Sequence, residues 1–242
     1  MITTDEACRD LIIRATNSQT AISVASLRAT DPVQRDIEVH FEHNGLHYDR
    51  RKNYHKLAAR PIDKIISISY LAQAITAILL HEPDNARARP SSLLKDDKRY
   101  ARVFAPDCPV QVYMICARIM RKVDEFLKAK GGAVSQSDKT NLRFYLATWA
   151  TCHLLGKAHI TPSDLVPEQE SLPTDEDLGN LLEQLRAELE AFSKDQEFAS
   201  DKNKAAKSRK FRQRVLDLVE KNLPGPESDL GDLTEVAGDL SG

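Results

Sequence analysis

The sequence predicts a mainly α fold, a helical bundle or array with a C-terminal helical hairpin and a disordered acidic tail. Three observations predict it. Apolar residues recur at the three- and four-residue spacing of a buried helix face through most of the chain. Apart from Asn44-Gly45, which is placed to end a predicted helix, no Asn-Gly hairpin signal occurs, so any sheet should be small. Residues 224–242 carry five acids and no base, which is typical of disorder.

The first predicted helix covers residues 5–15. It should end at the Thr-Asn-Ser stretch of residues 16–18, because these short polar side chains compete with the helix for backbone hydrogen bonds. Asn17 and Gln19 are therefore expected in a turn. Each carries an amide that can both donate and accept hydrogen bonds, so this turn is a candidate binding site.

The second predicted helix begins after Asp31, which is a suitable N-cap. Pro32 suits the first helical position, and Gln34 is placed as in a capping box. This helix should stop at Gly45. One buried face is formed by Val33, Ile37 and Phe41. The run from Tyr48 to Lys52 should then follow on exposed chain.

Three longer helices should form the centre of the fold. Residues 62–80 are apolar over a wide arc, although their β-branched start would also suit a strand. Residues 109–130 should form a helix that ends at Gly131-Gly132, and residues 137–155 should form another. The apolar stripe of the last helix consists of Leu142, Tyr145, Leu146, Trp149 and His153. In that stripe His153 is expected to be a hydrogen-bonded core histidine.

Composition divides the chain into four segments. Residues 1–160 should form a helical core, and they hold 24 Lys+Arg against 17 Asp+Glu, a net charge of +7. Residues 161–174 contain three prolines and three acids and predict a linker. Residues 175–223 predict the helical hairpin, and residues 224–242 the disordered tail. From residue 161 onward the count is 10 Lys+Arg against 19 Asp+Glu, a net charge of −9.

The predicted hairpin carries two apolar stripes separated by a basic segment. The stripes consist of Leu178, Leu181, Leu182, Leu185, Leu189 and Phe192, and then of Phe211, Val215, Leu218 and Val219. Residues 202–214 contain seven cations in thirteen positions. They could bind nucleic acid, although a solvated lysine-rich helix is the commoner outcome of such a run.

Several classes of protein are excluded or disfavoured by the sequence. No apolar run is long enough for a membrane span and no leader opens the chain, so we expect a cytoplasmic protein. The four cysteines, Cys8, Cys108, Cys116 and Cys152, lack CxxC spacing and suit reduced, buried thiols. His40, His43 and His47 lack the further ligands of a zinc site, so we predict neither a metal nor a cofactor.

The order of three motifs resembles a known family. The segments Asp10-Leu-Ile-Ile-Arg-Ala-Thr-Asn-Ser-Gln-Thr-Ala-Ile22, Ser26-Leu-Arg-Ala-Thr-Asp-Pro-Val-Gln34 and Gly45-Leu-His-Tyr-Asp-Arg-Arg-Lys52 resemble the central-to-C-terminal part of the AIPR (abortive infection phage resistance) proteins. The resemblance covers roughly the first two-fifths of the chain. It implies a role in phage defence, in which an infected bacterium is sacrificed or arrested before the phage matures.

The sequence also departs from the family pattern. Family members usually carry an Asn-Asn-Gly and an Asn-Gly-x-Gln motif upstream, and neither occurs before Asp10. Thr20 stands where the family commonly has a second Asn. We therefore expect a truncated or split member. No complete set of catalytic acids, metal ligands or nucleophile is visible, which leaves open whether the chain is an enzyme.

The resulting hypothesis is a cytoplasmic phage-defence protein that acts through DNA or RNA. The candidate nucleic-acid-binding residues are Asn17, Gln19, Tyr48, Arg50, Arg51 and Lys52, which offer amides for base edges, an aromatic face for stacking and cations for phosphate. Their alternative role is structural, in a turn and a loop. A rival function is a non-catalytic interaction subunit, whose helix over residues 178–192 docks an upstream-encoded partner that carries the missing motifs. A decayed fragment without activity is the third alternative.

Overall fold

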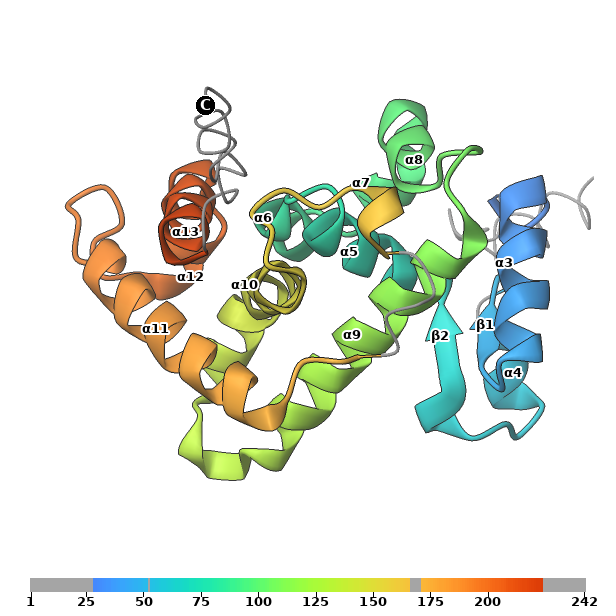
Figure 1. Ribbon diagram of the computed structural model, residues 1–242, viewed down its shortest axis with the longest axis horizontal. Coiled ribbons are helices and arrows are strands. Elements are labelled where there is room, and N and C mark those ends of the chain that lie inside the picture. Colours follow the sequence, from blue (N-terminus) through green and yellow to red (C-terminus); the bar gives the residue numbers. More distant parts are fainter. Residues whose placement is uncertain (1–27, 52, 166–170, 224–242) are drawn as a thin grey trace, which may run out of the picture.

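A computed structural model describes residues 28–51, 53–165 and 171–223, and the described chain is mainly α, as predicted (Figure 1). The predicted helix at residues 5–15 and the predicted tail at residues 224–242 lie outside these ranges. The elements, in chain order, are α3 (Pro32–His43), β1 (His47–Asp49), α4 (Tyr54–Leu57), η1 (Ile62–Lys64), β2 (Ile65–Ser67), α5 (Ile68–Ile78), α6 (Pro83–Ala88), α7 (Ser92–Lys95), α8 (Asp97–Val103), α9 (Val110–Ala129), η2 (Gly131–Ala133), α10 (Gln136–Leu155), η3 (Pro162–Leu165), α11 (Asp175–Ser193), α12 (Lys202–Ala206) and α13 (Arg209–Asn222).

A small parallel sheet joins two segments that the sequence placed in a loop and a helix. β1 pairs with β2 so that Tyr48 lies opposite Ile66. The prediction of one helix over residues 62–80 is therefore wrong at its start, because the β-branched residues there satisfy their backbone groups by strand pairing. Ser67 then caps α5 by accepting a hydrogen bond from the backbone N–H of Tyr70. The small size of the sheet is as predicted.

Helix α3 begins and ends where the sequence predicts, but its start is not a capping box. Asp31 occupies the N-cap position without a side-chain capping bond. The Gln34 side chain is buried and turns inward, where its Oε1 accepts a hydrogen bond from the Tyr48 hydroxyl at 2.6 Å. Its Nε2 donates to the Tyr100 hydroxyl at 3.0 Å. Gln34 therefore connects α3 to β1 and α8.

Helices α5, α9 and α10 pack against one another and form the centre of the core (Figure 1). α9 and α10 have nearly the predicted bounds. The predicted stripe of α10 is buried except at its last member, because His153 is exposed and its Nε2 lies 3.7 Å from Asp177 Oδ1. The prediction of a core histidine there is wrong. Of the cysteines, Cys116 and Cys152 are buried free thiols and Cys108 is half-buried, whereas Cys8 lies outside the described residues.

The C-terminal helices cover the outer side of α10. α11 and α13 are the two long helices of the predicted hairpin, and the short α12 lies between them (Figure 1). The Tyr145 ring lies 4.9 Å from that of Phe211, and its hydroxyl donates to the Ala206 carbonyl oxygen at 2.8 Å. The leucines of α11 are buried, so the stripe to which the rival hypothesis assigned a partner packs within the chain. Independent folding of residues 1–160 stays a prediction.

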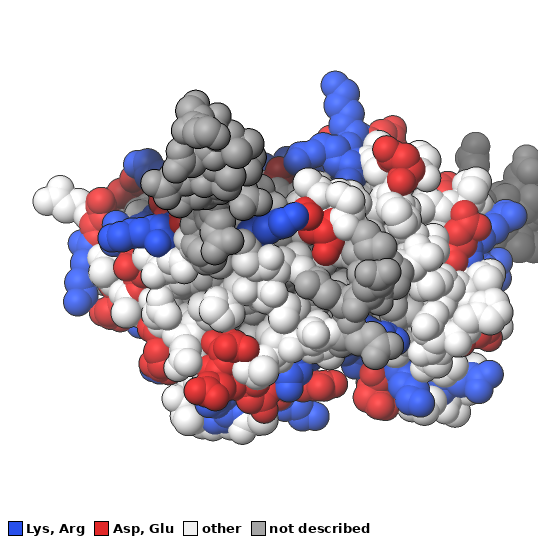
Figure 2. Space-filling view, in the orientation of Figure 1, with Lys and Arg blue, Asp and Glu red and all other residues white. Residues whose placement is uncertain are grey.

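Four of the seven cations of residues 202–214 form ion pairs with acids of the same chain. Lys202 pairs with Glu190, Lys210 with Glu197, Arg212 with Asp84 and Arg214 with Glu188. Acidic and basic side chains lie next to each other on the face drawn in Figure 2. Within the described ranges, none of the helices combines the length and apolarity needed to cross a lipid bilayer.

Candidate nucleic-acid interface

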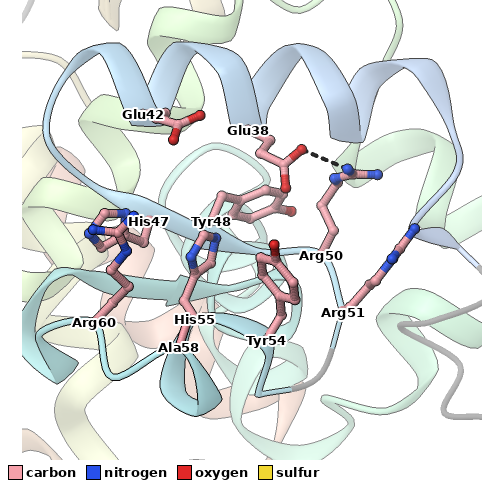
Figure 3. Close-up of a pocket in the computed structure, with 10 residues that line it drawn as sticks. All are labelled: Glu38, Glu42, His47, Tyr48, Arg50, Arg51, Tyr54, His55, Ala58 and Arg60. Carbon is pink, nitrogen blue, oxygen red and sulfur yellow. Dashed lines mark ion pairs between the residues drawn. The ribbon is translucent and has the colours of Figure 1, made fainter.

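A pocket of about 360 Å³ lies between α3, β1 and the segment that contains α4 (Figure 3). Three of the six predicted site residues, Tyr48, Arg50 and Arg51, line it. We call it the β1–α4 pocket. Its full lining consists of Glu38, Glu42, His47, Tyr48, Arg50, Arg51, Tyr54, His55, Ala58 and Arg60.

Tyr48 forms the floor of the pocket and does not lie on exposed chain. Tyr48 is only 1% exposed, and the centroid of its ring lies 5.4 Å from that of the Phe41 ring. The hydroxyl group is held by Gln34. Burial raises the pKa of Tyr48 well above its usual value. The prediction that Tyr48 is exposed is therefore wrong, because the alternation of strand β1 turns this side chain toward the core.

Arg50 is fixed in the wall of the pocket. Its Nη2 lies 2.6 Å from Glu38 Oε2 on α3, and its Nη1 donates to the Ala29 carbonyl oxygen (Figure 3). Nε is buried and has no hydrogen-bond partner among the described residues. Because Glu38 already balances the guanidinium, Arg50 braces α3 against β1. The neighbouring Arg51 is exposed, and the structure gives it no acidic partner in the described ranges.

Two imidazole rings stack along the inner wall. The His47 and His55 ring centroids lie 5.1 Å apart at an interplanar angle of 26°. The buried Asp49 carboxylate positions the second ring by accepting a hydrogen bond from the His55 backbone N–H at 2.8 Å. Desolvation, followed by the nearby charges of His55 and Arg60, lowers the pKa of His47. The His47 ring is therefore largely neutral at pH 7.

Residues that were not predicted complete the pocket. Tyr54 is 57% exposed, and its ring meets that of His55 edge-on at 5.1 Å. Arg60 is exposed and lines the pocket near His47 (Figure 3). Asn53 and Ala59, which flank α4, both have positive φ angles that turn the chain around the pocket. The sequence pattern that could have indicated these residues is the segment 50–60, which contains five Lys and Arg residues and no Asp or Glu.

Three predicted site residues cannot be compared with the pocket. Asn17, Gln19 and Lys52 lie outside the described residues. Among the residues that are described, no three His, Cys, Asp or Glu side chains are placed to hold a metal ion. The pocket therefore offers cations, imidazoles, an exposed aromatic ring and the exposed carboxylate of Glu42, which has no cationic partner among the described residues.

Comparison with known proteins decides the family. A family model described as AIPR protein matches residues 1–197 of the chain. The chain belongs to the AIPR family. The match extends from the N-terminal motifs to just past the end of α11, well beyond the two-fifths of the chain that the motifs covered. Neither a curated protein nor a solved structure matches.

AIPR membership supports a role in phage resistance by abortive infection. The β1–α4 pocket lies within the matched residues, and so do α9, which packs on α3, and α5, which packs on β2. Helices α12 and α13 lie beyond the match.

Proposed function

We propose that this AIPR protein acts in phage defence by binding single-stranded nucleic acid in the β1–α4 pocket, in the cytoplasm. The observation that carries the proposal is the exposed Tyr54 ring in a pocket that also holds the exposed cations Arg51 and Arg60. An aromatic face stacks on any base, and arginine binds phosphate through a planar fork of N–H donors.

The fixed groups around the pocket support this assignment. Arg50 is balanced by Glu38, and Tyr48 is hydrogen-bonded to Gln34, so neither is available for a ligand without loss of an internal contact. Arg51 and Arg60 remain to contact phosphate. A stacked base would lie on Tyr54, next to the stacked His47 and His55 rings.

The test is fluorescence anisotropy of a labelled oligothymidylate with the whole chain. Arg51→Gln plus Arg60→Gln should weaken binding and lower the slope of log affinity against log salt by roughly 1.4, since each phosphate contact on a single strand contributes about 0.7. Tyr54→Leu should weaken binding at every salt concentration, whereas Tyr54→Phe, which keeps the ring, should not.

The matched control is Lys98→Gln plus Lys221→Gln, which removes two exposed cations that do not line the pocket. It should leave both the affinity and the salt slope close to those of the wild type. Equal loss in the control and in the arginine variant would assign the binding to overall charge and contradict a site in this pocket.

A second function, docking of a partner protein, is favoured by a different observation. Leu57 is 84% exposed and Ile62 is 72% exposed, and both lie on the segment between β1 and β2. Large apolar residues exposed close together often mark protein contacts. Co-purification of an upstream-encoded protein, lost on Leu57→Ser, would favour this function over nucleic-acid binding.

A further inference from the structure

A second pocket, of about 490 Å³, lies among helices α5, α6, α9 and α10. It shares no residue with the β1–α4 pocket. We call it the α9–α10 pocket. Its lining consists of Gln73, Arg87, Asp124, Leu127, Lys128, Gln136, Lys139, Thr140, Arg143 and Phe144. Four of these side chains are cations and one is an acid.

The single acid is already neutralised. Asp124 Oδ1 lies 2.7 Å from Arg143 Nε, and its Oδ2 accepts hydrogen bonds from Arg143 Nη2 at 3.0 Å and from the Tyr70 hydroxyl at 2.8 Å. Because Asp124 and Arg143 form a hydrogen-bonded pair, they contribute little net charge to the pocket. The other three cations, Arg87, Lys128 and Lys139, therefore determine the electrostatic potential of the pocket.

Those three cations have no carboxylate partner among the described residues. Arg87 donates from Nε and Nη2 to Asn141 Oδ1 at 3.0 and 2.6 Å, and also to Asn203, so its partners are neutral amide oxygens. Burial lowers the pKa of Arg87. Lys139 Nζ donates to the Gly131 carbonyl oxygen at 2.6 Å. Lys128 is exposed.

This arrangement contrasts with the C-terminal helices, where Arg212 and Arg214 each meet an acid. A half-buried guanidinium that is hydrogen-bonded but not charge-balanced gains most from an anion that enters its pocket. Gln136, in the first turn of α10, also places the positive end of a 20-residue helix at the pocket.

We propose that the α9–α10 pocket binds the adjacent phosphate groups of a small polyphosphate ligand. Three uncompensated cations around one cavity match several negative charges on neighbouring phosphates. The volume lies in the range of about 300–1,000 Å³ that small-molecule sites occupy. Gln73 and Thr140 supply polar groups next to the cations.

Isothermal titration calorimetry of the whole chain with inorganic triphosphate tests the proposal, and a parallel titration with ATP distinguishes the source of the phosphates. Binding should be detected at low salt and should weaken as salt rises. The double variant Lys128→Gln plus Lys139→Gln removes one exposed and one half-buried lysine. It should weaken triphosphate binding by about tenfold. Tighter binding of ATP than of triphosphate would identify a nucleotide, and equal binding a free polyphosphate.

Two controls separate this site from the β1–α4 pocket. Lys98→Gln plus Lys221→Gln removes the same charge elsewhere and should bind triphosphate like the wild type. Arg51→Gln plus Arg60→Gln should also bind it normally, even if that variant has lost oligonucleotide binding. The proposal is overturned if triphosphate does not bind at low salt, or if the Lys128 and Lys139 changes have no more effect than the Lys98 and Lys221 changes. It is also overturned if the Lys128 and Lys139 changes abolish oligonucleotide binding and leave triphosphate binding intact.

Discussion

His81 connects the turn after α5 to the chain that follows α10. Its Nε2 accepts a hydrogen bond from the Ile160 backbone N–H at 3.2 Å, and its ring lies 5.9 Å from that of His159. Nδ1 is buried without a partner among the described residues. Desolvation, with a smaller contribution from His159, lowers the pKa of His81 to about 4. The folded protein therefore holds this imidazole in its neutral form.

We predict that His81 makes the fold sensitive to acid. In the unfolded chain the pKa of a histidine is about 6.5, so between about pH 6.5 and pH 4 the unfolded state binds more protons than the folded state. The stabilisation that neutral His81 contributes to the free energy of unfolding is present above pH 6.5 and is lost as the pH falls toward 4. His81→Asn should reduce the loss of unfolding free energy between pH 7 and pH 4.5 by on the order of 2 kcal/mol.

Urea unfolding at the two pH values measures this difference. Asparagine suits the position because His81 has a φ of 52°, a region that asparagine tolerates better than most residues. His43→Asn, on the exposed end of α3, is the control and should leave the pH dependence unchanged. Identical pH profiles for His81→Asn and the wild type would show that His81 does not set the acid sensitivity.

Tyr48 illustrates how far single residues can be interpreted from sequence. The residue type, followed by three cations, suited an exposed stacking face and a buried anchor equally well. Its environment depends on Gln34, 14 positions before it, and on Tyr100, which Gln34 contacts 66 positions further on. No local pattern encodes such a contact. The exposure of Arg51 was predictable, because an arginine in a run of cations without an acid is usually exposed.

At the scale of elements, α13 is attached to α6 by a buried ion pair. Arg212 Nη1 lies 2.9 Å from Asp84 Oδ1, and both side chains are largely buried. Burial raises the pKa of Asp84, and Arg212 opposes that shift. Arg214, two residues on, pairs with Glu188 at 2.6 Å, but its side chain is half exposed. The two arginines thus provide a buried pair and an exposed pair on one helix.

We predict that Arg212→Met lowers the free energy of unfolding by about 3 kcal/mol, because it leaves the Asp84 carboxylate buried without its partner. Arg214→Met should cost less than about 1 kcal/mol, as expected for an exposed pair. Urea unfolding at pH 7 measures both. Adding Asp84→Asn to Arg212→Met should restore part of the loss. Equal effects of the two single changes would argue against a structural role for the buried pair.

The long helices were predictable and the short elements were not. α9, α10, α11 and α13 carry many turns of regular apolar spacing, which specifies a helix and its buried face. β2 is three residues long, and α4 and α7 are four residues long each. Segments of this length depend on the surfaces against which they pack. The β1–α4 pocket is made largely from such segments, which is why the sequence indicated only Tyr48, Arg50 and Arg51 among its lining residues.

At the scale of the whole molecule, one hydrophobic core connects α3 at one end to α13 at the other. We predict a single cooperative unfolding transition for the described part of the chain, because α10 packs on both the N-terminal and the C-terminal helices. Differential scanning calorimetry should give equal calorimetric and van't Hoff enthalpies. Two separate transitions would instead support an independent boundary near residue 160, and Arg212→Met would then shift only the transition of the C-terminal helices.

The ion pair between α6 and α13 also has a consequence for synthesis on the ribosome. Asp84 and Arg212 are 128 positions apart in the chain. At about 5–20 residues per second, roughly ten seconds pass between the translation of the acid and that of its partner. Once residue 155 has been translated, the surface of α6 and α10 that α13 will cover is complete but still in contact with water. The last helix of the described residues, α13, therefore closes the core, and a ribosome that stalls before residue 212 would release a chain with this surface open to chaperones and proteases.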